Sequence, residues 1–128
     1  TSRHGIGQRE GSLQTPAGIH RIAQKIGEGE PEGRVFKARE ALDQICLPGD
    51  YDRQEDIIST RILWLDGLQP GINRHGDVDS HQRYIYIHGT ADEAHIGQPA
   101  SIGCVRMKNR DVTELFGLVE VDDLVIIE

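Results

Sequence analysis

Glycine is spread along the whole chain and limits how far any helix can run. Of the 128 residues 15 are glycine, and many of them separate short apolar stretches. Glycine supplies turns and weakens helix interiors, so this spacing favours a strand-rich fold over a bundle of long helices. A chain of this length is expected to form one domain, residues 1–128, with a core that needs no disulfide or metal.

Two central segments predict strands. Residues 57–65 carry apolar side chains on both faces, which is typical of a strand with a buried end. Residues 84–88 alternate, so that Ile85 and Ile87 face one way and His88 faces the other. We therefore expect His88 to project away from the core that contains the two isoleucines.

The remaining strand candidates are shorter. Residues 19–26 fit either a helix that begins at Pro16 or a strand, because their isoleucine spacing satisfies both periods. Residues 35–39 form a short alternating segment. Residues 124–127 are all apolar and predict a final buried strand.

One amphipathic helix is expected near the end of the chain. Its apolar residues recur at i, i+3, i+4 and i+7, and they are Val112, Leu115, Phe116 and Val119. Asn109 or Asp111 is the expected N-terminal cap. Gly117 should weaken this helix by about 1 kcal/mol relative to alanine. The overall prediction is a mainly β fold with one well-supported helix.

The chain is acidic, with a formal net charge of −7. A nucleic-acid partner is not expected, because phosphate binding needs a basic surface. No apolar run approaches the roughly 20 residues that a membrane-spanning helix needs. The chain begins at Thr1 without a signal peptide, and we interpret it as a processed product or a fragment. The sequence by itself therefore indicates no compartment.

The two cysteines, Cys46 and Cys104, have different surroundings. Cys46 lies in an apolar stretch that ends in Pro48 and Gly49, whereas Cys104 follows Gly103 at an expected turn. A single disulfide is the plainest interpretation of two cysteines. The different settings instead predict a buried structural thiol at 46, a reactive thiol at 104 and no bridge between them.

The segment 101–107, Ser-Ile-Gly-Cys-Val-Arg-Met, is the strongest candidate for chemistry. A thiol directly after Gly103 can be presented from a tight turn, with backbone N–H groups aimed at an oxyanion. A free thiol has a pKa of about 8.5 and needs a neighbouring base to become a good nucleophile. His88 is the candidate base, although a cysteine and a histidine apart in sequence also fit structural roles.

These residues belong to a wider pattern. His88-Gly89-Thr90, followed by residues 96–107 and then by Asn109 and Asp111, resembles the signature of the L,D-transpeptidase (YkuD-like) catalytic domain, a His, a spacer and then Ser/Thr-x-Gly-Cys. Thr15-Pro16-Ala17-Gly18 is similar to the Thr-Pro-x-Gly segment of that family. Leu115-Phe116 and residues 124–127 resemble its usual ending. The resemblance covers essentially the whole chain. It implies a mostly β sandwich with one short helix after the catalytic turn.

The resemblance also implies roles for individual residues. Cys104 matches the nucleophile, and His88 matches the general base. Gly89 matches the position whose backbone carbonyl orients that histidine. The N–H groups of Gly103 and Cys104 are the implied oxyanion donors.

Two further positions are implied near the substrate. Arg106 matches an arginine close to the bound peptide, although a surface salt bridge is an alternative role. Ser101 fits either a substrate contact or a turn residue. If the segment after Cys104 is extended, Arg106 and Cys104 share a face.

Members of this family cut the bond after the third residue of a peptidoglycan stem, form a thioester and pass the acyl group to an amine. The resemblance therefore implies an enzyme of cell-wall cross-linking, with stem peptides as partners, no cofactor, and a periplasmic or wall-associated location. A hydrolytic L,D-carboxypeptidase or endopeptidase is one alternative, and a non-catalytic wall-binding module is another. The presence of both Cys104 and His88 argues against the second alternative.

Two departures from the family pattern stand out. Ile102 occupies a position where many members carry histidine, and isoleucine cannot transfer a proton, so His88 is the only candidate base within the motif. Family domains usually have one or two strands ahead of the segment that resembles residues 1–3. Either the domain is trimmed here or the edge of the family differs.

Four histidines raise the question of a metal site. Their spacings are six or seven residues, unlike the tight pairs typical of zinc sites, and they are His75, His81, His88 and His95. No cysteine or carboxylate pattern accompanies them. We therefore predict no metal.

Overall fold

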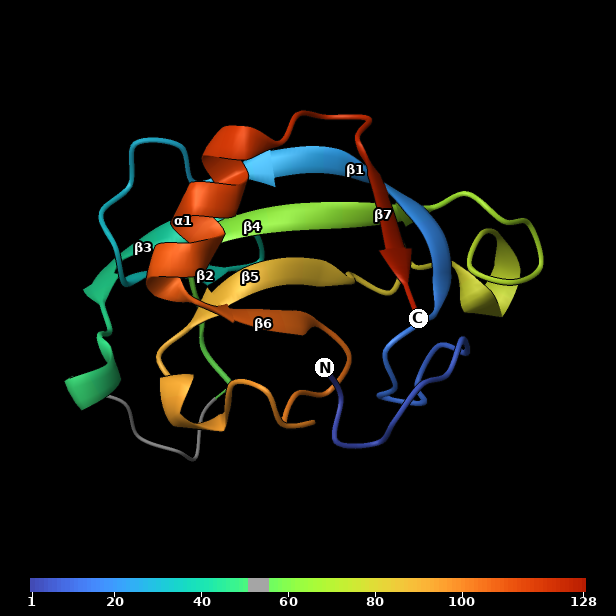
Figure 1. Ribbon diagram of the computed structural model, residues 1–128, viewed down its shortest axis with the longest axis horizontal. Coiled ribbons are helices and arrows are strands. Elements are labelled where there is room, and N and C mark those ends of the chain that lie inside the picture. Colours follow the sequence, from blue (N-terminus) through green and yellow to red (C-terminus); the bar gives the residue numbers. More distant parts are fainter. Residues whose placement is uncertain (51–55) are drawn as a thin grey trace.

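The computed structural model describes residues 1–50 and 56–128. Its strands are β1 (Gly18–Ile26), β2 (Arg34–Lys37), β3 (Glu40–Ile45), β4 (Ile58–Gly67), β5 (Tyr86–Thr90), β6 (Val105–Lys108) and β7 (Leu124–Ile127). One α-helix, α1 (Asn109–Leu118), lies between the last two strands (Figure 1). Short 3₁₀ turns occur at Pro48–Asp50, Gly76–Val78 and Glu93–His95. No helix in this described part of the chain is long and apolar enough to cross a membrane.

All seven strands belong to one sheet. Its main path runs β3-β2-β4-β1-β7, and β5 pairs with β4 and with β6. Every pair is antiparallel except β5–β6, whose strands run in the same direction. The predicted mainly β class with a short helix soon after the cysteine turn is confirmed. The strands form a single continuous sheet, and β4 lies at its centre.

The two faces of the sheet carry separate clusters of buried side chains. On one face α1 packs across β4 and β5 (Figure 1). Its Val112 and Phe116 share a buried cluster with Leu63, Leu65 and Ile87. The opposite face buries a second cluster, which contains Phe36, Ile62 and Tyr86 and against which Trp64 and Cys104 pack. Adjacent residues of β4 therefore serve different cores, as strand alternation requires.

The predicted strand at 57–65 and the helix at its predicted position are both confirmed. Residues 18–26, for which the sequence allowed helix or strand, form β1. This segment forms a strand because it pairs with β4 on one side and with β7 on the other. A segment with such partners gains backbone hydrogen bonds on both edges, which local periodicity does not reveal.

The expected helix cap is wrong. Lys108 occupies the N-cap position and makes no capping side-chain hydrogen bond. Asn109 is the first helical residue and is buried, and Asp111 lies in the first turn. The backbone N–H of Asn109 donates to Oε1 of Glu93 at 3.0 Å. The capping group therefore comes from a distant segment, which also complements the positive end of the helix dipole.

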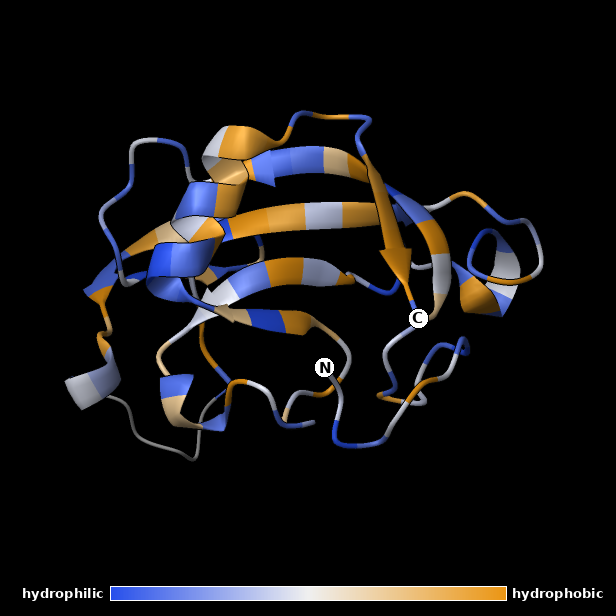
Figure 2. Cartoon of the chain, viewed as in Figure 1, coloured by the Kyte–Doolittle hydropathy of each residue, from blue (hydrophilic) through white to orange (hydrophobic). Residues whose placement is uncertain are grey.

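The expectation of a buried final strand is also wrong. Among the described strands β7 pairs only with β1, and Leu124 and Ile126 are 67% and 64% exposed. Val125 and Ile127 are half-buried and pack against the α1 cluster. Figure 2 shows β7 as an apolar strand at the edge of the fold. An apolar run thus predicted the strand but not its position at the edge.

The strand that carries His88 begins two residues later than the alternation indicates. Tyr84 lies outside β5, is 53% exposed and has φ 57°. Ile85 and Ile87 do join the α1 cluster, whereas His88 belongs to the other face. The predicted opposition of His88 to the two isoleucines is therefore confirmed.

Candidate active site

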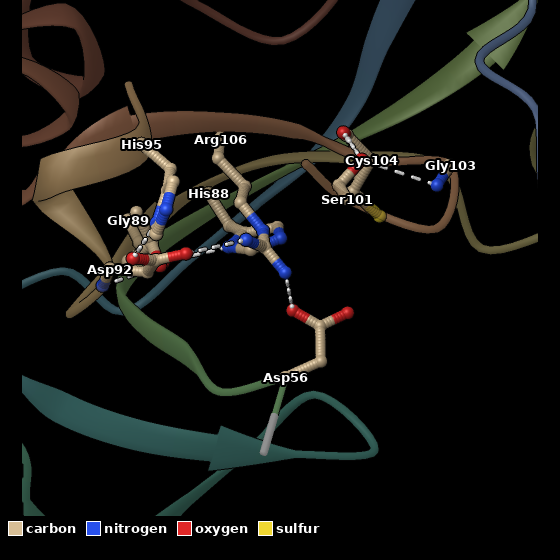
Figure 3. A network of polar contacts seen from close by, with 10 residues as sticks. Asp56, His88, Gly89, Asp92, His95, Ser101, Gly103, Cys104 and Arg106 are labelled. Carbon is tan, nitrogen blue, oxygen red and sulfur yellow. Dashed lines mark hydrogen bonds and ion pairs between the residues drawn. The ribbon is translucent and has the colours of Figure 1, made fainter. Parts of the chain in front are cut away.

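The β5–β6 pair brings the candidate residues to one face of the sheet. In its parallel register His88 lies opposite Arg106, and Ile87 lies opposite Val105. Ile87 and Val105 contact the α1 cluster, so His88 and Arg106 face the other way. Cys104 precedes β6 and packs against the cluster on this second face. Cys104, one residue before β6, and His88 on β5 therefore share this face of the sheet (Figure 3).

His88 is held in one orientation by its own strand. Its side chain is buried, and its Nδ1 lies 2.7 Å from the carbonyl oxygen of Gly89. The hydrogen bond that the resemblance implies is therefore present. An Nδ1–H that donates to this carbonyl leaves Nε2 as the basic nitrogen. Burial lowers the pKa of His88 from 6.5, and the positive charge of Arg106 lowers it further, against the opposing effects of Gly89 and Asp56.

Gly89 fits its position because a side chain would not. A Cβ there would lie 2.6 Å from Asn109 Oδ1 and 2.6 Å from the carbonyl oxygen of Ser59. The Asn109 oxygen accepts hydrogen bonds from Ser59 Oγ at 2.9 Å and from Thr60 Oγ1 at 2.7 Å. These three residues hold the backbone whose carbonyl orients His88. The sequence motif included Asn109, but no sequence feature pointed to Ser59 or Thr60.

Thr60 is also a backbone outlier. Its φ is 74°, in the region that β-branched residues rarely adopt, and the β4–β5 register shifts between Ser59 and Ile62. Its hydroxyl both donates to Asn109 and accepts the N–H of Gly33 at 3.0 Å. This irregularity in β4 therefore lies where the Ser59 and Thr60 hydroxyls bond to Asn109 beside Gly89.

Cys104 is half-buried and protonated at neutral pH. Its Sγ lies 3.4 Å from the N–H donor of Tyr86 and 3.5 Å from the carbonyl oxygen of Tyr84, to which the thiol can donate. Burial raises the pKa of the thiol to about 11. The carboxylate of Asp56 also raises this pKa, while the N–H of Tyr86 and the charges of Arg106 and Arg83 oppose the rise.

Hydrogen bonds to the Ser101 hydroxyl stabilise the turn before Cys104. Ser101 is buried, its Oγ donates to the Cys104 carbonyl at 2.6 Å, and it accepts the Gly103 N–H at 3.2 Å. Gly103 has φ 141°, which favours glycine, and its carbonyl accepts a hydrogen bond from Thr15 Oγ1 at 2.9 Å. The Cys104 N–H has no acceptor among the described residues. Ile102 is 45% exposed.

The guanidinium of Arg106 is already paired. Its Nη1 lies 3.3 Å from Asp92, and its Nη2 donates to Asp56 (Figure 3). Asp92 also contacts Nδ1 of His95 at 2.6 Å. The Arg106 side chain is only 10% exposed, and its Nε is buried without a partner in the described part of the chain. A substrate carboxylate would have to displace one of these aspartates.

Both cysteines lie in the described ranges, and no disulfide joins them, as predicted. Cys46 is buried in a cluster with Val35 and Ala91, separate from the cluster against which Cys104 packs. Within residues 1–50 and 56–128, no three histidine, cysteine or acidic side chains are placed to hold a metal ion.

This face thus carries a thiol, an imidazole oriented by a backbone carbonyl, and an open N–H at a glycine turn. Cysteine acyltransferases use groups of these kinds. The chain matches the family model of the L,D-transpeptidase catalytic domain, YkuD, over residues 1–127, and it belongs to this family. No individual curated protein matches the chain.

Proposed function

We propose that this protein is a cysteine-dependent L,D-transpeptidase that acts on peptidoglycan stem peptides. The observation that carries the proposal is the placement of Cys104 and His88 on one sheet face, with the His88 ring fixed by the Gly89 carbonyl. The family to which the chain belongs supports the same chemistry. The proposed place of action is the cell wall or periplasm.

In the first step Cys104 Sγ attacks the carbonyl carbon of the scissile peptide bond. The S–H proton passes to Nε2 of His88 as the S–C bond forms. Collapse of the tetrahedral intermediate breaks the C–N bond, and His88 returns the proton to the departing amine. The products are a thioester on Cys104 and the released terminal residue.

The resting protonation states favour this order of events. A thiol whose pKa is about 11 is not a thiolate at neutral pH, so the proton must leave during attack. His88, whose pKa is lowered by burial, is neutral and ready to accept it. Arg106 and Arg83 lower the thiol pKa, and the same positive charge favours the anionic intermediate.

The oxyanion is bound at the glycine turn. The open N–H of Cys104 is the first donor, and the N–H of Gly103 becomes a second donor if Ser101 Oγ releases it. Ser101 acts as a positioning residue, because its hydroxyl ties the Gly103 N–H to the Cys104 carbonyl. This role differs from direct substrate contact, which the resemblance also allowed.

In the second step an acceptor amine attacks the thioester. His88 takes a proton from the amine, a new amide C–N bond forms, and the Cys104 thiol regains its proton. If water replaces the amine, the product is a free acid and the enzyme acts as a hydrolase. The acceptor therefore decides between cross-linking and trimming.

Intact-mass spectrometry tests the proposal. The protein is incubated with a stem tetrapeptide, or with a carbapenem as an acylating agent, and one covalent adduct is expected. Cys104→Ala should abolish the adduct, and the matched variant Cys46→Ala should retain it. An adduct that follows Cys46, or the absence of any adduct, contradicts the proposal, and the latter favours a non-catalytic module. Adding an amine acceptor then distinguishes amide product from hydrolysed acid.

A further inference from the structure

Arg39 stands at a strained turn between β2 and β3. Ala38 and Arg39 have φ values of 48° and 67°, a left-handed pair that glycine or asparagine usually fills in such hairpins. A residue retained in this conformation without glycine carries a cost of about 1 kcal/mol or more. Such an outlier raises the question of what the Arg39 side chain contributes.

The Arg39 side chain rests on a group of rings, which we call the aromatic rim. Its members are Trp64, His81, Tyr84 and Tyr86, and Trp64 stacks on His81 with centroids 4.0 Å apart. The guanidinium carbon of Arg39 lies 5.0 Å from the ring centroids of both Trp64 and Tyr84. Its Nη1 donates to the Tyr86 hydroxyl at 3.2 Å. These contacts fix the position of the charged group.

The aromatic rim adjoins Cys104. The backbone N–H of Tyr86 and the carbonyl of Tyr84 both contact Sγ of Cys104. Trp64 and Cys104 pack against the same buried cluster. Arg39 is therefore anchored to the residues that flank the proposed nucleophile, although it comes from a separate hairpin.

Arg39 and Arg106 differ in whether the guanidinium pairs with a carboxylate of the described residues. Arg106 is paired with Asp56 and Asp92. Arg39 contacts no carboxylate among the described residues, and its Nε and Nη2 make no hydrogen bond within that part of the chain. Two parallel donors on a fixed guanidinium match the geometry of a carboxylate.

We propose that Arg39 binds a carboxylate of the substrate and thereby selects acidic peptides for Cys104. This inference rests on the proposed function and names the part of the substrate that the aromatic rim recognises. The protein has a net charge of −7, so its overall field repels an anionic peptide. Arg39 is a cation with no carboxylate partner among the described residues, and it is anchored on rings whose backbones flank the thiol. Such a cation offsets that repulsion and fixes the register of the peptide.

Equilibrium binding tests the inference without requiring turnover. In the Cys104→Ala protein, calorimetry compares a stem tetrapeptide with free carboxylates and the same peptide with its carboxylates amidated. Arg39→Gly should weaken binding of the acidic peptide on the order of 10-fold and leave the amidated peptide nearly unchanged. Arg39→Lys, which keeps the charge and loses the fork, should fall between. The exposed Arg110→Ala on α1 is the matched control and should change neither affinity.

Glycine is chosen because it adopts φ 67° without strain, so the variant should melt close to the parent temperature. An equal loss for both peptides, no loss for either, or no binding of either peptide by the parent overturns the inference. Acylation of wild-type Cys104 is measured separately. An adduct without an Arg39-dependent preference rejects this inference alone, whereas a preference without an adduct rejects the proposed function alone.

Discussion

At the scale of single residues, the Cys104 thiol and the His88 imidazole are both neutral and do not form a thiolate–imidazolium pair. Burial raises the pKa of Cys104 to about 11 and lowers that of His88. Many thiol enzymes instead depress the pKa of their cysteine to obtain a thiolate before substrate arrives. In the proposed mechanism the imidazole therefore takes the proton during attack, and the rate should depend on the protonation state of His88.

Replacement of His88 tests this dependence. Wild-type acylation should rise through a pKa below 6.5 as His88 loses its proton, and then stay level through neutral pH. In His88→Ala the rate at pH 7 should fall by roughly 10²–10⁴. It should then climb steadily toward pH 11 as thiolate forms. Stopped-flow mass or absorbance measurements across pH give both profiles, and identical profiles would exclude His88 as the base.

Asp56 affects the thiol itself, because its negative charge disfavours the thiolate of Cys104. Its negative charge raises the pKa of Cys104, so Asp56→Asn should lower that pKa and increase the thiolate fraction. Alkylation of Cys104 by an uncharged reagent at pH 8 should become roughly 2- to 10-fold faster. The exposed Asp111→Asn on α1 should leave the rate unchanged. A slower reaction in Asp56→Asn would show that its pairing with Arg106 matters more than its charge.

At the scale of elements, the site depends on how β4, β5 and α1 meet. Gly89 lies where these elements approach most closely, against Ser59 and Asn109. The sequence could indicate a glycine in a motif but not the reason for it. That reason lies in a close contact between segments 30 and 20 residues apart, which no local pattern encodes.

Two glycine substitutions test whether the contact of Gly89 with Ser59 and Asn109 is as tight as the structure indicates. Gly89→Ala would place a Cβ 2.6 Å from two oxygens, so β4 or α1 must shift. We expect a loss of about 1–3 kcal/mol in the free energy of unfolding, together with weaker acylation as the His88 carbonyl partner moves. Gly117→Ala in α1 meets no atom within 4 Å and should stabilise the helix by up to about 1 kcal/mol. Denaturant titration of both variants measures these changes, and equal stability in the two would argue against a tight junction.

Element prediction succeeded where periodicity reflects packing on one face. The alternation at Ile85, Ile87 and His88 and the amphipathic spacing of α1 both follow directly from burial on a single side. It predicted the bounds of β7 but not its exposure, and it failed at the helix cap. An apolar run does not reveal whether a strand has one neighbour or two, and a cap supplied by Glu93 comes from outside the helix. Both errors concern partners, not local propensity.

At the scale of the whole molecule, the face around Cys104 is assembled from distant segments. The motif identified Cys104 and His88, and the β5–β6 register brings them together. Asp56 and Arg39 reach the same face from other parts of the sheet. Their spacing in the sequence carries no signature, so only the fold could place them near the thiol. The sequence motif thus contained the candidate thiol, the candidate base and Arg106, whereas it did not contain Asp56 or Arg39.

Two buried histidines make the free energy of unfolding depend on pH. His20 bonds to the Gly18 carbonyl at 3.1 Å and to Ser80 Oγ at 2.9 Å, and burial lowers its pKa, as it does that of His88. Above pH 6.5 both folded and unfolded states hold neutral histidines, so the full stability is present. Below that value the histidines of the unfolded chain become protonated while those of the folded protein stay neutral. The free energy of unfolding then falls by up to about 1.4 kcal/mol per pH unit for each group.

The melting temperature should therefore decrease between pH 7 and pH 5, before most carboxylates titrate. His20→Gln, which keeps a polar side chain and removes one titrating group, should flatten this decrease, because only His88 then resists protonation. The exposed His4→Gln should leave the slope as in the wild type. Calorimetric melting in matched buffers measures all three slopes. A melting temperature that is constant or rises as the pH falls would mean that the buried imidazoles accept protons in the folded state, and it would also remove the basis for a neutral His88 at the site.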